Sequence, residues 1–451
     1  MRRAAAAVIV ALGASACGPD APGVDATVQA VLSAPSGVQC IRIVASSATR
    51  SEVRQFAVAQ GQASQPLALR GLPTGNVLFA GAAYGVPCEA IAEAQPTWVA
   101  DPTVQVLQPG APATLTLTFH LRGSETDAAD YLGSQYSVAT LAGSGAAGNA
   151  DGVGTEAQLT SPSAIALGPQ TAYVADMGNH AVRTLDPATG AVGTLALGVE
   201  LPDLRGLALF GVDLFATDGC AIRRIDLPHA TQSVLVGDPA CGDGSPFGSL
   251  RGIVAIGATL YVADAGQHVI RRVVLDPAGP KASILAGQGT AGAADGVAGF
   301  ALFNAPDGLA AAPNGQLIYV ADRGNCTVRR VSLVDGSVDT LPGLAGACAV
   351  VDEAGDLARF SAPAGVAADD SSVFVADAAG QTVRRIDLAS SAVMTIAGSG
   401  AAGHFDGVGA AARFAFPALL TLDATGKLYL ADSGNHAIRT LTRLAPPLVE
   451  P

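Results

Sequence analysis

Short apolar runs separated by turn residues fill the chain from about residue 138 onward. Six similar runs end in small residues or glycine: VATLAG at 138–143, VGTLAL at 192–197, SVLVG at 233–237, SILAG at 283–287, DTLPG at 339–343 and MTIAG at 394–398. A second set consists almost wholly of small apolar residues: AIAL at 164–167, GLAL at 206–209, GIVAI at 252–256 and GVAA at 365–368. Because apolar and polar positions do not alternate in the second set, we predict strands that are covered on both faces.

One longer string follows each strand of the second kind and occurs six times. The copies are VADMGNHAVR at 174–183, ATDGCAIRR at 216–224, VADAGQHVIRR at 262–272, VADRGNCTVRR at 320–330, VADAAGQTVRR at 375–385 and LADSGNHAIR at 430–439. The aspartate of one copy and that of the next are separated by the length of chain that a four-stranded propeller blade requires, with loops of variable length. The pattern predicts an all-β fold built from repeated blades.

The order of the strands predicts how the ring closes. The first outer strand precedes the first inner strand, and no outer strand follows the last copy of the string. We therefore expect residues 137–142 to complete the last blade, which would join the two ends of the ring and remove an open edge. This arithmetic predicts six blades.

The repeated string resembles the NHL repeat, and the resemblance covers about residues 138–442. It implies a six-bladed NHL-type β-propeller over residues 136–442, followed by a tail at 443–451. Some six-bladed relatives, such as gluconolactonase-like enzymes and amidating lyases, hold a metal at the entry of the inner strands.

The region before the repeats carries seven alternating runs but no copy of the string. The runs are ATVQAVLSA, QCIRIVASS, VRQFAVAQ, QPLALRGL, NVLFAGAAYG, TVQVLQPG and ATLTLTFHLRG. They predict a small Ig-like or transthyretin-like β-sandwich over residues 25–123, with a polar linker at 124–135.

The segment 1–17 has the features of an export signal. Arg2 and Arg3 precede an apolar run at 4–12, which is too short for a permanent membrane span. Residues 14–17 resemble a bacterial lipobox ending at Cys17, although Ala14 stands where leucine is usual. The resemblance implies lipidation of Cys17, and Gly18 after it implies release to the outer membrane; the alternative is an ordinary cleaved signal. Either alternative predicts an exported protein, attached to a membrane only through an N-terminal lipid.

The six other cysteines form an even set, as expected for disulfides in an oxidising compartment. Cys220 and Cys326 fall within the repeated string, and Cys241 and Cys348 follow them at nearly equal spacing, each just after an outer strand. We predict the pairs Cys220–Cys241 and Cys326–Cys348, which leaves Cys40 to pair with Cys88. A zinc site is the alternative, but the chain has no Cys-x-x-Cys or His-x-x-x-His spacing.

The charge and composition of the chain bear on its possible partners and on its fold class. The 25 basic and 38 acidic residues leave a net charge of −13, which opposes binding to a phosphate backbone, so we do not expect a nucleic-acid partner. Charged residues make up only 14% of the chain, while 54 glycines and 27 prolines suit many short strands joined by turns.

Repeated polar residues favour structural roles. The aspartate and the first arginine of each string predict an ion pair in every blade, and His180, His268 and His436 predict hydrogen bonds to a neighbouring loop.

A second motif combines an aspartate with a proline at one constant spacing: Asp151 with Pro162, Asp295 with Pro306, Asp352 with Pro363 and Asp406 with Pro417. An apolar residue stands between the two each time, at Leu159, Phe303, Phe360 and Phe414. We interpret the motif as a turn with an inter-blade plug, since it lacks the strict nonapeptide period of calcium-binding repeats.

The entry of each inner strand is the place to look for a ligand site in a propeller. By alignment, the six residues there are Ser163, Arg205, Arg251, Asp307, Ala364 and Ala418. One carboxylate and no histidine make a metal site a weak hypothesis, and we predict no metal, no cofactor and no catalytic residue. Arg205 and Arg251 can receive a carboxylate or phosphate, with Asp307 beside them. The alternative is that they pair with Asp203, Asp307 or Asp243 and seal the channel.

Two functions therefore follow from the sequence. The favoured one is a non-catalytic cell-surface or periplasmic binding scaffold, monomeric, with an unknown protein or glycan partner on the loop-rich propeller face. The other is a propeller hydrolase or lyase acting on a small substrate in the channel. An acidic or histidine-rich cluster in the channel would favour the enzyme, and an alanine-lined or arginine-sealed channel would disfavour it.

Overall fold

The computed structural model describes residues 6–8, 26–32, 39–46, 51–57, 65–72, 75–84, 88, 98–107, 117–121, 136–242 and 245–444. It has two compact units: Met1–Ser137 with Gly407–Ala411 and Arg443–Pro451, and Val138–Asp406 with Ala412–Thr442. Cys17, the predicted linker at 124–135 and most of the predicted tail lie outside the described residues.

The first unit contains a six-stranded sheet in the order β1-β8-β7-β6-β3-β4 and a two-stranded sheet of β2 and β5. The strands are β1 (Ala6–Val8), β2 (Ala26–Leu32), β3 (Cys40–Ser46), β4 (Ser51–Ala57), β5 (Gln65–Leu72), β6 (Gly75–Tyr84), β7 (Trp98–Leu107) and β8 (Leu117–Leu121). Strands β2 to β8 overlap the seven runs expected from the alternation. Strand β1, which lies within the predicted signal peptide, pairs antiparallel with β8.

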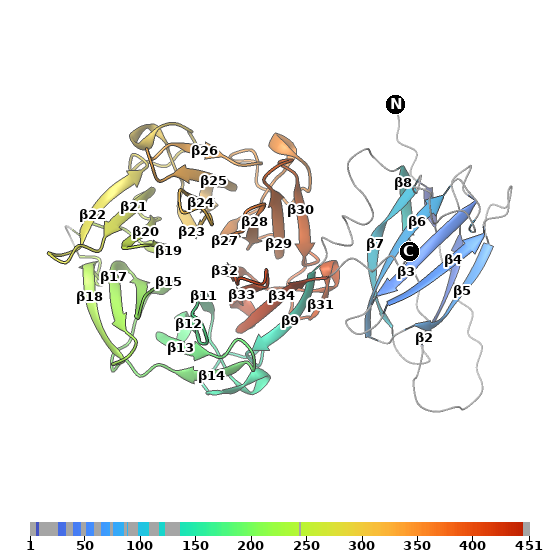
Figure 1. The fold of residues 1–451 in the computed structure, drawn as a ribbon, viewed down its shortest axis with the longest axis horizontal. Coiled ribbons are helices and arrows are strands. Elements are labelled where there is room, and N and C mark those ends of the chain that lie inside the picture. The colour runs from blue at the N-terminus through green and yellow to red at the C-terminus, as the bar shows by residue number, and fades with distance from the viewer. Residues whose placement is uncertain are drawn as a thin grey trace. The chain divides into compact units, whose positions relative to one another are not determined.

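The second unit is a propeller of six sheets arranged in a ring (Figure 1). From the centre outward, blade 1 consists of β11 (Pro162–Leu167), β12 (Ala172–Asp176), β13 (Ala181–Leu185) and β14 (Ala191–Thr194). Blade 2 consists of β15 (Leu204–Phe210), β16 (Asp213–Asp218), β17 (Cys220–Asp226) and β18 (Thr231–Asp238). Blade 3 consists of β19 (Leu250–Ile256), β20 (Thr259–Asp264), β21 (Val269–Val274) and β22 (Lys281–Ala286). Blades 4 and 5 are β23 (Pro306–Ala311), β24 (Leu317–Asp322), β25 (Thr327–Ser332), β26 (Val338–Thr340); and β27 (Pro363–Ala368), β28 (Ser372–Asp377), β29 (Thr382–Asp387), β30 (Val393–Ala397). The all-β, six-bladed prediction is confirmed.

Blade 6 closes the ring in the predicted way. It contains β32 (Pro417–Leu422), β33 (Leu428–Asp432), β34 (Ala437–Arg443) and, beside β34, the strand β9 (Tyr136–Ala142) from the other end of the repeats. The Thr440 hydroxyl donates to the Ala139 carbonyl across this seam, at 3.4 Å. Two short strands extend the outer edges: β10 (Gly152–Val153) in blade 1 and β31 (Gly407–Val408) beside β9.

The remaining described elements are single turns of 3₁₀ helix. Three follow β12, β24 and β33: η3 (Met177–Asn179), η5 (Arg323–Asn325) and η8 (Ser433–Asn435). Four lie in the loops between blades: η2 (Gly154–Glu156), η4 (Ala298–Phe300), η6 (Gly355–Leu357) and η7 (Gly409–Ala411). No helix in the part of the chain that the structure describes is long and apolar enough to cross a bilayer.

A buried ion pair recurs in every blade, as predicted. The distances are 2.8 Å for Arg183–Asp176, 2.7 Å for Arg223–Asp218, 3.0 Å for Arg271–Asp264, 2.8 Å for Arg329–Asp322, 3.7 Å for Arg384–Asp377 and 2.7 Å for Arg439–Asp432. Burial raises the pKa of Asp322 and Asp432 above the usual value, although their arginines oppose the shift.

The aspartate of the aspartate–proline motif binds the buried arginine of its blade, so the motif does more than form a turn. Asp295 accepts hydrogen bonds from the buried Arg329 at 2.6 Å and from Thr340 on the outer strand at 2.9 Å. The equivalent contacts to arginine and threonine recur at Asp151, Asp352 and Asp406. The plug predicted at Phe303 is fully buried, and the Arg329 guanidinium lies 5.2 Å from its ring. Each loop is therefore anchored to both the middle and the outer strand of its blade.

The histidines of the repeated string occupy a left-handed turn and have a structural contact in two of three cases. Nδ1 of His268 accepts from the Ala305 N–H, and Nδ1 of His436 accepts from the Ser161 N–H, both at 3.0 Å and both in the next blade. Nδ1 of His180 is buried and has no hydrogen-bond partner among the described residues.

Three disulfides join the pairs Cys40–Cys88, Cys220–Cys241 and Cys326–Cys348. The two propeller bridges close loops of similar length, with sequence separations of 21 and 22 residues. Each therefore restricts the unfolded chain to a similar degree.

Replacing both Cys220 and Cys241 by serine is expected to lower the free energy of unfolding by about 3 kcal/mol, because the unfolded chain regains loop entropy. Urea unfolding of oxidised protein measures the change, and the Cys326→Ser/Cys348→Ser variant should match it within about 1 kcal/mol. A double variant as stable as the parent would contradict the prediction.

A second prediction concerns acid stability. Burial acts to raise the pKa of Asp151, but hydrogen bonds from Thr194 and Arg183 and the arginine charge outweigh it, so the pKa lies below its ordinary value. A lowered folded-state pKa stabilises the fold above the unfolded value, and this contribution disappears as the pH falls through the folded-state pKa. Asp151→Asn should therefore cost about 0.2–1 kcal/mol near neutral pH.

Urea unfolding at about pH 7 and about pH 3 tests this dependence. The difference between Asp151→Asn and the parent should shrink toward zero at the lower pH. Asp370→Asn, at an exposed position, is the control and should show little difference at either pH. A cost that grows on acidification would contradict the sign.

Candidate functional site

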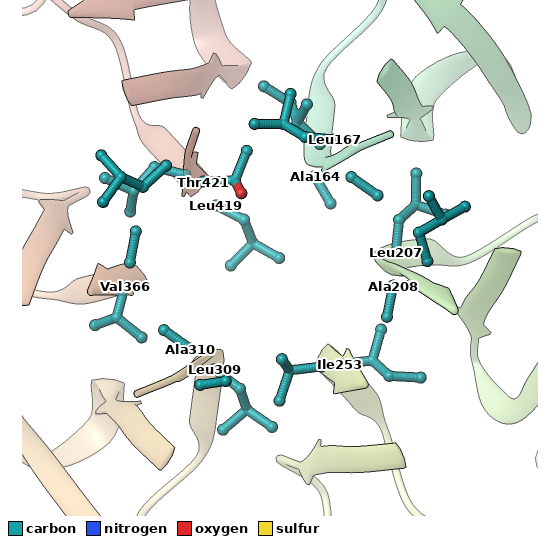
Figure 2. Close-up of a pocket in the computed structure, with 18 of the residues that line it drawn as sticks. Ala164, Leu167, Leu207, Ala208, Ile253, Leu309, Ala310, Val366, Leu419 and Thr421 are labelled. Carbon is teal, nitrogen blue, oxygen red and sulfur yellow. The ribbon is translucent and has the colours of Figure 1, made fainter. Parts of the chain in front are cut away.

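The propeller channel has an apolar wall built by the six inner strands (Figure 2). The cavity has a volume of about 260 Å³, and Thr421 is the one polar residue among those that line it. Small side chains such as Ala164, Ala310 and Ala367 occur because inner strands of adjacent blades converge here. The observed wall is apolar and consists mainly of alanine, leucine, isoleucine and valine.

The channel mouth is a separate cavity of about 170 Å³ at the start of the inner strands. It brings together all six residues that alignment placed at the strand entries: Ser163, Arg205, Arg251, Asp307, Ala364 and Ala418. They meet because each one follows the residue that pairs with the aspartate of its blade, so all six stand at the same place in their strands. The paired residues are Pro162, Leu204, Leu250, Pro306, Pro363 and Pro417.

Two further large side chains line the mouth that the alignment of the strand entries did not identify. Arg323 follows the blade aspartate, where the other blades have Met177, Gly219, Ala265, Ala378 and Ser433. Phe416 precedes the inner strand, where the other blades have Ser161, Asp203, Ser249, Ala305 and Ala362. Each is a large residue at a position that is otherwise mostly small. That departure from the repeat is the signal by which alignment can find them.

The described residues of the mouth carry more arginines than carboxylates. Nε of Arg205 donates to Asp203 at 2.6 Å, and Arg323 pairs with Asp307 at 3.0 Å. Arg251 has no ionic partner among the described residues, which exclude Asp243. Among the described residues, three guanidinium groups against two carboxylates leave one positive charge. The alternative that the arginines pair with nearby aspartates therefore holds for Arg205, which pairs with Asp203. Asp307 pairs with Arg323 and not with Arg205 or Arg251.

The polar groups of the mouth suit binding more than acid–base chemistry. The Ser163 hydroxyl is hydrogen-bonded to the Leu204 carbonyl at 3.2 Å, and the cavity is lined by Asp307 as its single carboxylate and by no histidine. Within the described ranges, no group of three or more histidine, cysteine, aspartate or glutamate side chains is placed to hold a metal ion. A guanidinium that is free to pair can bind a carboxylate or a phosphate.

Curated relatives match the repeated part of the chain. NHL repeat-containing protein 2 of Bos taurus is 31% identical over 320 residues, which is 65% of this chain and 40% of that protein. The propeller is of the NHL-repeat type. NHL repeat-containing protein 2 of Homo sapiens is 30% identical over 320 residues, with the same coverage. The chain thus spans about two-fifths of the length of these relatives, and no family model matches it.

Solved structures share the fold of the NHL propeller chain at low identity. A Bacteroides thetaiotaomicron protein of unknown function has a TM-score of 0.57 at 16% identity, covering 89% of this chain and 90% of its own. A protein of the same organism described as an auxiliary nutrient binding protein has a TM-score of 0.55 at 14% identity, covering 82% and 94%. These similarities establish the fold alone.

Proposed function

We propose that this chain is a non-catalytic binding scaffold that works outside the cytoplasm and uses the loop-rich face of its NHL propeller to hold a protein or glycan partner. The observation that supports it is the collection of non-repeated side chains at the channel mouth above an apolar channel. The repeated pair of Asp322 and Arg329 holds its blade together. By contrast, Arg323 and Phe416 each occur at their repeat position in one blade only, Arg251 shares its position only with Arg205, and all of them line one cavity.

The exported location is part of the proposal. Three disulfides favour an oxidising compartment. Residues 1–17 would act as the signal peptide, Cys17 would carry the lipid, and the outer membrane would be the destination. The first unit, as an Ig-like or transthyretin-like sandwich over residues 25–123, would then separate the propeller from the membrane. Two structures of similar fold are described as auxiliary nutrient binding proteins, which agrees with a binding role.

Cys17→Ser tests the anchor. In a bacterial host, the parent is expected in the membrane fraction and the variant in the soluble extracytoplasmic fraction, because a lipid supplies the only proposed attachment. A parent recovered wholly in the soluble fraction would contradict lipidation.

Binding without turnover tests the function itself. The full chain is titrated calorimetrically with a panel of oligosaccharides and peptides, and each bound compound is then recovered and examined by NMR. The expected result is a binding partner that is recovered chemically unchanged. Conversion of a panel member that is abolished by Arg251→Ala would overturn the scaffold in favour of an enzyme at the mouth.

A further inference from the structure

We infer that the channel mouth binds the carboxylated terminal sugar of an acidic glycan, with the carboxylate on Arg251 and one face of the sugar ring on Phe416. This inference rests on the proposed binding function and narrows it to one chemical class. Its support comes from the floor, the wall and the charge of the cavity.

Leu419 forms the floor. It stands at a strand position that is Gly206, Gly252, Gly308 and Gly365 in four blades and Ala164 in the fifth. The glycines let adjacent blades approach: a Cβ on Gly206 would lie 2.5 Å from the Arg251 carbonyl oxygen. Blade 6 instead places a leucine there.

The Leu419 side chain points into the channel in Figure 2 and reaches past blade 5 to blade 4. A Cβ on Gly308 would lie 2.8 Å from Leu419 Cδ2. Leu419 lines both the mouth and the apolar channel below it. A ligand in the mouth would therefore meet an apolar side chain at the inner end of the cavity.

Phe416 forms one wall. The residue is 60% exposed, and its backbone has a φ of 49°, a conformation that costs energy for a bulky residue. Gln381 of the preceding blade holds this conformation by accepting from the Phe416 N–H at 2.7 Å. An exposed aromatic ring offers a negative face, against which the weakly positive C–H groups on one side of a sugar ring pack.

Arg251 supplies the charge. Its guanidinium has no ionic partner in the part of the chain that the structure describes, and its planar fork matches the two oxygens of a carboxylate. Arg205 donates to Asp203 through its Nε atom. Ser433 adds a hydroxyl at the edge of the cavity, suited to a sugar hydroxyl.

The size of the mouth suits the terminal sugar of a glycan better than the whole glycan. Its volume of about 170 Å³ is below the roughly 300–1,000 Å³ of pockets that enclose a drug-sized molecule. One ring with its carboxylate fits this description, while the rest of the glycan extends over the loops. A peptide ending in a carboxylate would engage Arg251 but has no ring to cover Phe416 unless its last residue is aromatic.

Two matched probes test the inference on the unaltered full chain: methyl β-glucuronide and its neutral counterpart methyl β-glucoside. Calorimetric titration should show the glucuronide binding at least about tenfold more tightly, because the two probes differ only in the group that faces Arg251. Saturation-transfer NMR should place the C–H groups of one ring face nearest the protein. Equal binding of the two glycosides, or no binding of the glucuronide, would overturn the inference.

Variants separate the two contacts. Arg251→Gln should weaken the glucuronide about tenfold or more and remove the preference over the glucoside, and Phe416→Ser should weaken both glycosides. The controls are Arg272→Gln and Phe300→Ser, both exposed and absent from the mouth, which should bind like the parent. Inorganic phosphate that binds as tightly as the glucuronide would overturn the inference, since it would show an anion site without sugar recognition.

The failure of this inference is distinguishable from the failure of the proposed function. If the glucuronide fails but a neutral glycan or a peptide binds and is recovered unchanged, the scaffold stands and the acidic-sugar assignment is wrong. If the glucuronide binds and is converted, the ligand class stands and the scaffold is wrong.

Discussion

Arg329→Ala is expected to lower the free energy of unfolding by about 3–5 kcal/mol, whereas Arg330→Ala on the same strand should cost at most about 1 kcal/mol. The two arginines are adjacent and each pairs with an aspartate at 2.8 Å. Arg329 and Asp322 have no exposed side-chain surface, while Arg330 and Asp339 are 42% and 50% exposed. Removal of Arg329 leaves a buried carboxylate without its cation.

The expected cost includes the loss of two further contacts. Arg329 also binds Asp295 of the inter-blade loop and lies over the Phe303 ring. The cost should shrink as the pH falls, because a protonated Asp322 no longer needs the cation and burial already raises its pKa. Urea unfolding near pH 7 and near pH 4 measures both variants. Equal costs at the two arginines would show that the blade pair adds nothing beyond a surface ion pair.

Val138→Pro is expected to open the ring and to destabilise the propeller by about 3 kcal/mol or more. Val138 is buried in β9, a strand with neighbours on both sides, where proline removes a backbone donor and its ring disturbs the pairing. β9 lies beside β34 at the seam between the two ends of the repeats. Loss of this pairing leaves two unpaired strand edges.

Val138→Ala is the matched control, because it removes only methyl groups and should cost about 1 kcal/mol. Thermal unfolding and limited proteolysis compare the two variants with the parent. The proline variant should expose cleavage sites near 136–142 and near the end of β34, and the alanine variant should not. A proline variant as resistant as the parent would show that the ring does not depend on this strand.

The repeats made the fold predictable. Six copies of one string determine six blades, and the position of the first outer strand predicts which segment closes the ring. The recurrence of aspartate and arginine likewise predicted a pair in every blade, since residues at equal places in equal units meet in the same way. The nucleic-acid, monomer and export predictions have no such geometric consequence and stay predictions.

The mouth was only partly predictable. Alignment placed Arg205, Arg251 and Asp307 at strand entries, and they do line one cavity. It did not bring in Arg323 or Phe416, which reach the mouth from a turn and from a loop, nor the contact of Thr340 with Asp295. The strand entries do not specify where these side chains go, so their meeting depends on how the turns and loops lie on the face.

The sequence by itself determined the repeat, the number of blades, the seam and the partner of each buried aspartate, because these follow from local strand order repeated six times. The tertiary structure decided which arginine at the mouth has no carboxylate partner among the described residues, and that the Leu419 side chain lies between the mouth and the channel. Both depend on the paths of single side chains: Arg323 turns back to Asp307 within blade 4, and Leu419 of blade 6 reaches Gly308. Strand order does not specify the reach or direction of a side chain, which only packing against its neighbours determines.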